Sequence, residues 1–373
     1  MKNFLCWLIF PSGKTCQNKK MNDWKIIEHL IQTRELLPPL QRDSVLTSGE
    51  ELGGADLMLT TFLKGNHLEQ FLFLVEVKAS STPLIVQNAI HQIKSIHRKK
   101  NDPEMHPMIV VPYLSEERLK DLEEAQVSGI DLCGNGMVII PQRLCIYRSG
   151  NKNLYPESRA LSNPYRGRSA MVARALITQS HFETMGELHA TIQAGEAELS
   201  FSQVSKAVSA LEQELIVASS GRSIRLIDPL RLLDHLAAEW RSPRTQKRYL
   251  RVSNPLAALS RLSHAEVAWA ITGESSVTKY AAFGEGRPIR VAVSNLLKAA
   301  QILEGVPEEI PNFADIELIE TTEAGFYFQN QRDAGGIRWA SPLQAWIELK
   351  NGDGRQQDAA REIREKILAE IKQ

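Results

Sequence analysis

The first strong hydrophobic pattern in the chain has the spacing of a helix. Its apolar positions recur at intervals of three and four residues, at Ile26, Ile27, Leu30 and Ile31. Asn22 or Asp23 can cap a helix over residues 24–37, and a Pro-Pro pair then stops it. Residues 1–21 contain an apolar run too short to span a bilayer, and we interpret them as an N-terminal extension.

The next apolar runs have the character of strands. Residues 56–63 and 70–79 flank a polar turn and predict a hairpin. A helix over 81–99, a strand over 108–111, a helix over 115–125 and strands over 129–132 and 137–140 are expected to follow. This α-β-β-α-β-α-β order predicts a central sheet flanked by helices in a domain spanning residues 22–150.

Beyond residue 150 the pattern becomes helical. Residues 151–168 form a basic, turn-rich linker, and a compact domain is expected over 169–242. Its predicted elements are helices at 169–177, from Thr184, from Ser200 or Ser202 to 216, and over 228–240, with a hairpin over 217–227.

The remaining residues, 243–373, predict an α+β domain that ends in a charged helix over 356–371. Residues 268–276 are interpreted as a helix entering a turn. The acidic positions near its middle predict a solvated face: Asp315, Glu317, Glu320 and Glu323.

Composition adds little to this multi-domain α/β and α+β picture. A chain of 373 residues is long enough for two or three domains, and 44 basic residues balance 44 acidic ones. Net charge therefore gives no hint of nucleic-acid binding. The cysteines form no CxxC pair, which argues against structural zinc and favours a cytoplasmic protein: Cys6, Cys16, Cys133 and Cys145.

The clearest candidate chemistry lies on the predicted hairpin of residues 56–79. Glu76 and Lys78 share one face of a strand because side chains alternate, and Asp56 begins the neighbouring strand. Two converging carboxylates can hold Mg²⁺, and a lysine beside them can stabilise negative charge on a phosphate. An E-x-K on a strand also arises by chance on solvated faces. Here it interrupts an apolar run, where unpartnered charges are costly.

Asp56, Glu76 and Lys78 stand in a pattern that resembles the PD-(D/E)xK nuclease superfamily, with restriction-endonuclease-like members. The resemblance covers roughly residues 22–141, although Ala55 replaces the motif's proline. It implies Mg²⁺ (or Mn²⁺) held by Asp56 and Glu76. By position it also suggests Glu28 or Glu35 on the first helix as a further ligand and Gln92 as an accessory catalytic residue.

A second candidate site is the predicted helix that starts near Ser200. Its polar face is small and not acidic, which suits a DNA major groove, and Gln203 and Lys206 would reach base edges beside Ser202 and Ser205. The order of three helices and a hairpin resembles the winged-helix fold. Arg222 and Arg225 would then contact phosphates, with further backbone contacts from Arg166, Arg168 and Arg174. The alternative is a helical bundle with a solvated serine-rich face.

Residues 169–373 also resemble AbiEi-family antitoxins of type IV toxin–antitoxin systems, through Ser341-Pro342-Leu343-Gln344-Ala345-Trp346 and the closing helix. This resemblance implies a transcriptional repressor with a cognate toxin or another defence-system protein as partner. Two functions therefore follow: a Mg²⁺-dependent endonuclease targeted to double-stranded DNA in bacterial defence or mobile-element biology, or an antitoxin-like repressor whose nuclease-like domain is non-catalytic. No membrane partner is expected, and a homodimer would suit a palindromic site.

Overall fold

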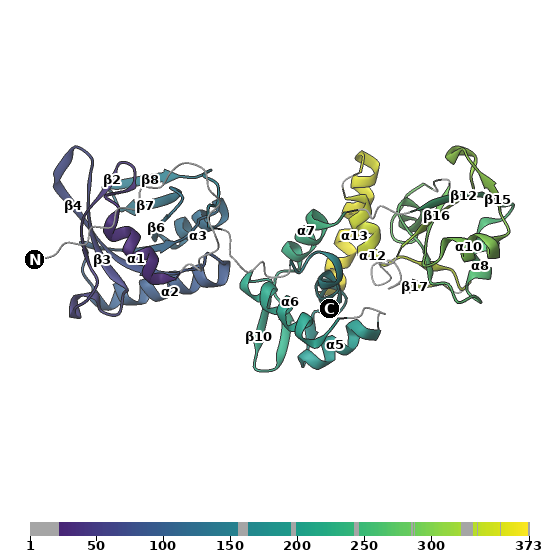
Figure 1. Cartoon of the computed structure of the whole chain (residues 1–373), viewed down its shortest axis with the longest axis horizontal. Coiled ribbons are helices and arrows are strands. Elements are labelled where there is room, and N and C mark those ends of the chain that lie inside the picture. The colour runs from purple at the N-terminus through teal and green to yellow at the C-terminus, as the bar shows by residue number, and fades with distance from the viewer. Residues whose placement is uncertain are drawn as a thin grey trace, which may run out of the picture. The chain divides into compact units, whose positions relative to one another are not determined.

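The computed structural model describes residues 22–155, 163–194, 199–241, 246–284, 286, 288–321, 331–333, 335–350 and 352–371. The chain divides into two compact units, Met1–Ala160 and Leu161–Gln373 (Figure 1). Several sheets and many helices confirm the expected multi-domain mixture of α and β structure. Within the described part of the chain, no helix is long and apolar enough to cross a membrane.

An eight-stranded sheet forms the centre of the first unit, and its strands lie in the order of the sequence. Neighbouring strands are antiparallel except for two parallel pairs, β4 with β5 and β5 with β6. The strands are β1 (Glu35–Leu37), β2 (Leu40–Leu46), β3 (Leu57–Leu63), β4 (Asn66–Val77), β5 (Met105–Val111), β6 (Ser128–Asp131), β7 (Gly136–Ile140) and β8 (Leu144–Arg148).

Helices cover both faces of this sheet. Strand alternation sends Val75 and Val77 into a core shared with α1 (Asp23–Gln32), while Leu74 joins the opposite core with α2 (Pro83–Lys100) and α3 (Glu116–Ala125). Because both faces of the sheet are covered, the C-terminal end of β4 has apolar side chains on both faces. A charged side chain at this end of the strand must therefore be buried or lie at the edge of the sheet.

The predicted first helix was wrong beyond Gln32. Thr33 is extended, and residues 35–37 form β1, which pairs with β2 across the Pro38-Pro39 turn. A residue before proline disfavours helical backbone, so Leu37 is extended and buried as part of this hairpin. The sequence interpretation also missed β8, the last strand of this domain, although Ile146 lies in its core.

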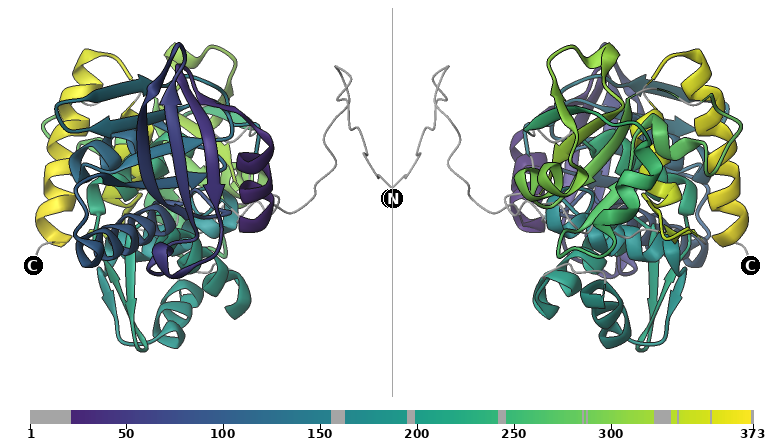
Figure 2. Two further views of the ribbon diagram at one scale, coloured as in Figure 1. Left: turned by 90° about the vertical axis from the view of Figure 1, so that its left-hand side faces the viewer. Right: turned by 90° about the vertical axis from the view of Figure 1, so that its right-hand side faces the viewer.

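The second unit opens with a helical module. The four predicted helices and the predicted hairpin are present, and a short strand, β9, adds a third member to the hairpin's sheet. In Figures 1 and 2 the hairpin is a ribbon beside the helices of this module. The elements are α4 (Ala170–Thr178), β9 (His181–Phe182), α5 (Met185–Ala194), α6 (Phe201–Gln213), β10 (Val217–Ser220), β11 (Ser223–Leu226) and α7 (Pro229–Glu239).

A seven-stranded mixed sheet follows, flanked by α8 (Pro255–Leu262) and α10 (Leu296–Leu303). Its strands are, in sheet order, β15 (Val306–Glu308), β12 (Lys247–Arg251), β16 (Ile316–Glu320), β14 (Ile289–Val293), β13 (Trp269–Ile271), β18 (Arg338–Trp339) and β17 (Gln331–Arg332). The prediction of a helix over 268–276 was wrong. Trp269 is fully buried in strand β13, and only the four-residue α9 (Glu274–Val277) is helical.

The solvated face expected of three acidic residues near this sheet also needs correction. Glu317 is only 4% exposed and accepts from Lys247 and Arg290, so it belongs to a buried ion-pair network. Asp315 and Glu320 accept backbone N–H groups, whereas Glu323 lies outside the described residues. These carboxylates therefore hold the sheet together instead of forming a solvated face.

The last two helices return to the helical module. α12 (Pro342–Leu349) and α13 (Gly354–Ile371) share one hydrophobic core with α4 and α7, to which Ala345 and Ile363 contribute. A bidentate contact from Arg364 to Asp234 on α7 adds to that packing. The C-terminal chain thus completes the core of residues 163–240.

Candidate active site and nucleic-acid interface

The first candidate site begins at a glycine turn before β3. Gly53 has the left-handed backbone that glycine favours, with φ of +57°, and Gly54 has φ of +102°. The Ala55 N–H then donates to the Leu52 carbonyl at 3.0 Å. A proline at Ala55 would lose that donor, which gives a physical reason for the departure from the PD-(D/E)xK motif.

The turn delivers Asp56 to the end of β4. Its backbone N–H donates to the Val75 carbonyl at 3.1 Å, and its carboxylate Oδ2 accepts from the Val77 N–H at 2.8 Å. Asp56 is partly exposed, and one carboxylate oxygen stays available beyond this bond. The expected approach of Asp56 to the end of strand β4 is therefore present.

Glu76 and Lys78 lie beside Asp56 with very different exposure. Glu76 is 0% exposed, whereas 27% of the Lys78 side chain is exposed. The Lys78 amine donates to Oε1 of Glu76, and Oε2 of the same carboxylate is buried without a hydrogen-bond partner among the described residues. An unsatisfied buried acceptor costs about 1–3 kcal/mol, so the fold maintains this arrangement against its own stability.

The electrostatics of the pair follow from that burial. Desolvation raises the pKa of Glu76, the Asp56 charge raises it further, and the Lys78 hydrogen bond opposes both. For Lys78, burial would lower the pKa, but the bond and charge of Glu76 outweigh it and raise the pKa. Lys78 therefore stays a cation and is not a general base at neutral pH.

An acidic residue that the sequence interpretation missed acts on this site. Asp23, the first residue of α1, contributes its charge to the raised pKa values of both Glu76 and Lys78. Glu28 instead accepts from the Trp24 indole at 2.9 Å on an exposed face, and Glu35 lies on β1 instead of on the helix. The signal available in the sequence was the cap: Asp23 follows Asn22, whose side chain caps α1.

Gln92 lies on α2, the helix that follows β4 in the chain. It is exposed on α2, nine residues beyond Pro83, which places it about 14 Å further along the helix axis. The helix begins five residues after Lys78, so the first turn of α2 is closer to Lys78 in the sequence than Gln92 is. The catalytic role of Gln92 stays a prediction of the resemblance.

The donor set suits a hard cation in part. Across the described ranges, no group of three or more His, Cys, Asp or Glu side chains is placed to hold a metal ion. Mg²⁺ commonly keeps several waters and takes only one or two carboxylates, and the buried Oε2 of Glu76 is an acceptor without a donor. The two carboxylates of Asp56 and Glu76 are therefore the number and type of protein ligand that Mg²⁺ commonly takes.

The second candidate site is the exposed face of α6. Ser200 caps this helix, and a capping box joins it to Gln203. The Ser200 hydroxyl accepts from the Gln203 backbone N–H, and the side-chain Oε1 of Gln203 accepts from the Ser200 N–H. Ser202 and Lys206 are exposed and Ser205 is half-buried. Gln203 thus has a structural role that sequence reasoning did not foresee.

The arginines expected beside α6 differ in availability. Arg222 and Arg225 are exposed on the hairpin, with Arg222 in its two-residue turn after Gly221. Arg168 is also exposed, but Arg166 is paired with Glu239. The expectation for Arg174 was wrong: it is 3% exposed and donates to Gln344 at 2.8 Å inside the core.

Comparisons with known proteins give little to add. No protein-family model matches the chain, and no curated protein matches it. Among solved structures, a chain of an EndoMS-dsDNA2 complex is similar at 11% identity and a TM-score of 0.22, over 36% of this chain. The matched part spans about half, 51%, of that other chain. A match at this level does not establish a shared fold.

Proposed function

We propose that this protein is a metal-dependent DNA endonuclease of the PD-(D/E)xK type, with Asp56, Glu76 and Lys78 as its reactive set. One observation carries the proposal: a fully buried Glu76 carboxylate keeps one oxygen unpartnered beside Asp56 and the Lys78 cation. A folding protein gains nothing from that arrangement. A cation-binding site requires it, because the oxygen must be free for the ion.

Each residue has a distinct task in this proposal. Asp56 and Glu76 would hold Mg²⁺ or Mn²⁺, and the ion, when bound, neutralises negative charge on the scissile phosphate. Asp56 is fixed for this task by the Val77 N–H. Lys78 remains protonated beside Glu76 and would donate hydrogen bonds to the phosphate oxygens or to the attacking water, stabilising the charge that develops.

In this proposal the helical module is a winged helix that binds double-stranded DNA and brings the nuclease domain to it. The order of α4, β9, α5, α6 and the β10–β11 hairpin supports that interpretation. Lys206 and Ser202 on α6 would face the major groove, and Arg222 and Arg225 would contact backbone phosphates. Arg168 can add a further phosphate contact, whereas Arg166 must first leave Glu239.

Plasmid cleavage tests the enzyme. Supercoiled DNA is incubated with the full chain and Mg²⁺ or Mn²⁺, beside Glu76→Gln and Lys78→Met, with Glu28→Gln as a matched acidic control on α1. The proposal expects metal-dependent nicking or linearisation in the parent and in the control, and a loss of at least a hundredfold in both site variants. Cleavage that persists equally in all four proteins contradicts it.

A second candidate is an AbiEi-like repressor with a non-catalytic first unit. The observation in its favour is the ion pair itself, since Lys78 occupies Oε1 of Glu76 in the structure. The shared core of α4, α7, α12 and α13 also makes the helical module and the C-terminal chain one unit. A repressor retains duplex binding in Glu76→Gln and Lys78→Met and shows no cleavage with either metal.

A further inference from the structure

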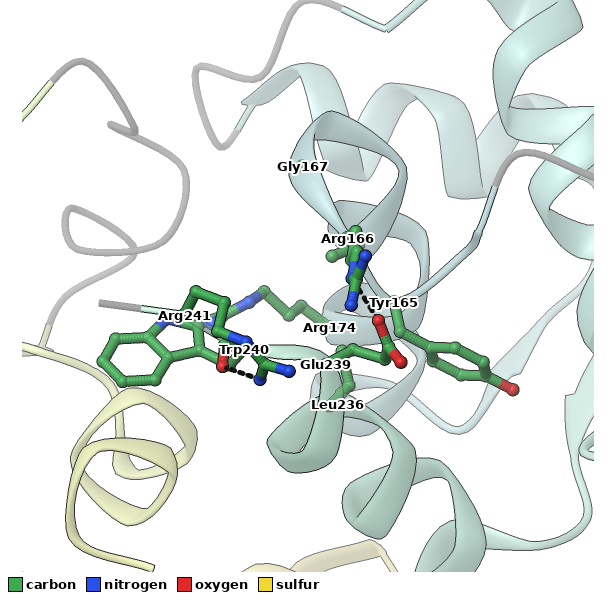
Figure 3. Close-up of a pocket in the computed structure, with 9 residues that line it drawn as sticks. Tyr165, Arg166, Gly167, Arg174, Leu236, Glu239, Trp240 and Arg241 are labelled. Atoms are coloured by element: carbon green, nitrogen blue, oxygen red, sulfur yellow. Dashed lines mark hydrogen bonds and ion pairs between the residues drawn. The ribbon is translucent and has the colours of Figure 1, made fainter. Parts of the chain in front are cut away.

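A cavity of about 320 Å³ lies in the second unit, between the start of α4 and the end of α7 (Figure 3). It is separate from α6's exposed polar face, which carries Ser202 and Lys206. A volume near 300 Å³ is the lower end of the range in which proteins bind small organic molecules.

The walls of this cavity are rich in cationic donors. Three arginines line it, Arg166, Arg174 and Arg241, against a single acidic residue, Glu239. That carboxylate is already engaged, because it pairs with Arg166 and accepts from the Asn163 side-chain amide at 3.1 Å. The lining therefore offers an excess of positive charge to whatever enters.

Two of these guanidinium groups are held in place by the fold. Nη1 of Arg241 donates to the carbonyls of Ala238 and Trp240 at 2.7 and 2.8 Å, at the C-terminal end of α7. Arg174 donates to Gln344 at 2.8 Å within the core. Side chains that are fixed before a ligand arrives lose little conformational entropy when they bind it.

The cavity also has an aromatic wall with an unused donor. Trp240 lines it, and the indole Nε1–H of this residue is buried with no acceptor among the described residues. In Figure 3 the indole of Trp240 and the guanidinium of Arg241 lie close together at one end of the pocket, with Tyr165 and Arg166 at the other. Donors thus come from more than one side.

We propose that this cavity binds a small organic phosphate, with Arg241 and Arg166 on the phosphate group and Trp240 beside the organic part. Guanidinium groups suit phosphate because they donate two parallel hydrogen bonds to its oxygens. The Trp240 indole would supply a hydrogen bond and an apolar face to a planar ring such as a nucleobase. A hydrophobic ligand would leave these donors without acceptors, and a cation would be repelled.

Calorimetric titration of the full chain tests the site, with inorganic pyrophosphate and AMP as probes and sulfate as a general anion. Saturable one-to-one binding of pyrophosphate or AMP is expected in the parent. Arg241→Gln, at an exposed position, and Trp240→Phe should each weaken it, Arg241→Gln by at least tenfold. Arg355→Gln, exposed near the start of α13 and outside the cavity lining, is the matched control and should leave binding unchanged. No saturable binding, binding of sulfate with equal affinity, or equal binding in Arg241→Gln overturns the proposal.

A duplex-DNA shift with the same variants separates a free phosphate from a DNA backbone phosphate. The proposal expects Arg241→Gln to retain DNA binding while its affinity for pyrophosphate falls. Arg222→Gln, added in this assay, should bind DNA more weakly and keep its affinity for pyrophosphate. Parallel loss of DNA and pyrophosphate binding in Arg241→Gln assigns the cavity to the DNA backbone and overturns it. Neither result depends on cleavage, so failure of the endonuclease proposal leaves this test intact.

Discussion

Lys78 donates a hydrogen bond to one carboxylate oxygen of Glu76, and the other oxygen of Glu76 is buried without a partner. Only one of the two carboxylate oxygens therefore has a hydrogen-bond partner among the described residues. The pKa of Glu76 is raised because burial and the charge of Asp56 outweigh the lowering by Lys78. Sites that trade stability for function have this character.

Glu76→Gln should therefore stabilise the first unit at neutral pH. A group whose folded pKa lies above its ordinary value of 4.5 favours the folded state only while protonated, so stability falls as pH rises through that interval. Removing the buried charge should add on the order of 1 kcal/mol at pH 7. Hydrogen exchange of amides in β4 and β5 measures this, and faster exchange in the variant would contradict the explanation.

The acidic residue at the start of α1 offers a second prediction. Asp23 acts electrostatically on Glu76 and Lys78, whereas Glu28 faces solvent and accepts from Trp24. Asp23→Asn should weaken Mn²⁺ binding severalfold, and Glu28→Gln should not. Manganese titration monitored by proton relaxation compares them. Equal affinities in the two variants would remove Asp23 from the site.

The chain's local patterns predicted much of this first unit and failed where tertiary pairing decided. Residues 56–63 and 70–79 are apolar runs on either side of a polar turn, so the hairpin and the shared face of Glu76 and Lys78 were predictable. Residues 35–37, Glu-Leu-Leu, are too short to have a strand signal of their own. They become β1 because β2 pairs with them, and no local pattern records that partner.

The same limit explains the missed site features. Arg174 is buried against Gln344, 170 residues away, so its place near the basic linker gave the wrong expectation of a DNA contact. Likewise, Trp269–Ile271 is short, and only its neighbours β14 and β18 make it a strand. The sequence did show that Asp23 lies at the start of a helix, but it could not show that this helix end lies near Glu76.

The capping box of α6 separates two roles in the proposed recognition helix. Gln203→Ala should destabilise the second unit by about 1 kcal/mol, because the reciprocal bonds with Ser200 are lost. Lys206→Ala should leave stability unchanged and reduce duplex affinity by severalfold in low salt, with a shallower salt dependence. Chemical denaturation and fluorescence anisotropy give the two readouts. A Lys206→Ala protein with parental affinity and salt slope would exclude this residue from the interface.

The buried link between α4 and α12 predicts a larger effect on stability. Gln344 accepts from Arg174 at 2.8 Å and donates to Glu348 at 2.6 Å, and Glu348 in turn accepts from Thr272 at 2.9 Å. Gln344→Ala removes a shared partner of the buried Arg174 and the half-buried Glu348 and should cost about 1–3 kcal/mol. Urea unfolding of the second unit measures it, with Gln301→Ala at an exposed position of α10 as a control. Equal midpoints for the two variants would show that the link is not stabilising.

Acid sensitivity of the first unit is expected to depend on His106. This side chain on β5 is 8% exposed and packs near Phe73, with ring centroids 5.9 Å apart. Burial, and then the charge of Arg143, lowers its pKa below the ordinary value of 6.5. The folded state therefore resists protonation more than the unfolded chain does, and stability should fall as pH drops below about 6.5 towards the folded pKa. His106→Leu should flatten the pH dependence of β5 amide exchange between pH 6.5 and 5, whereas His91→Leu on the exposed face of α2 should keep the parental slope. A His106→Leu protein as acid-sensitive as the parent would place the responsible group elsewhere.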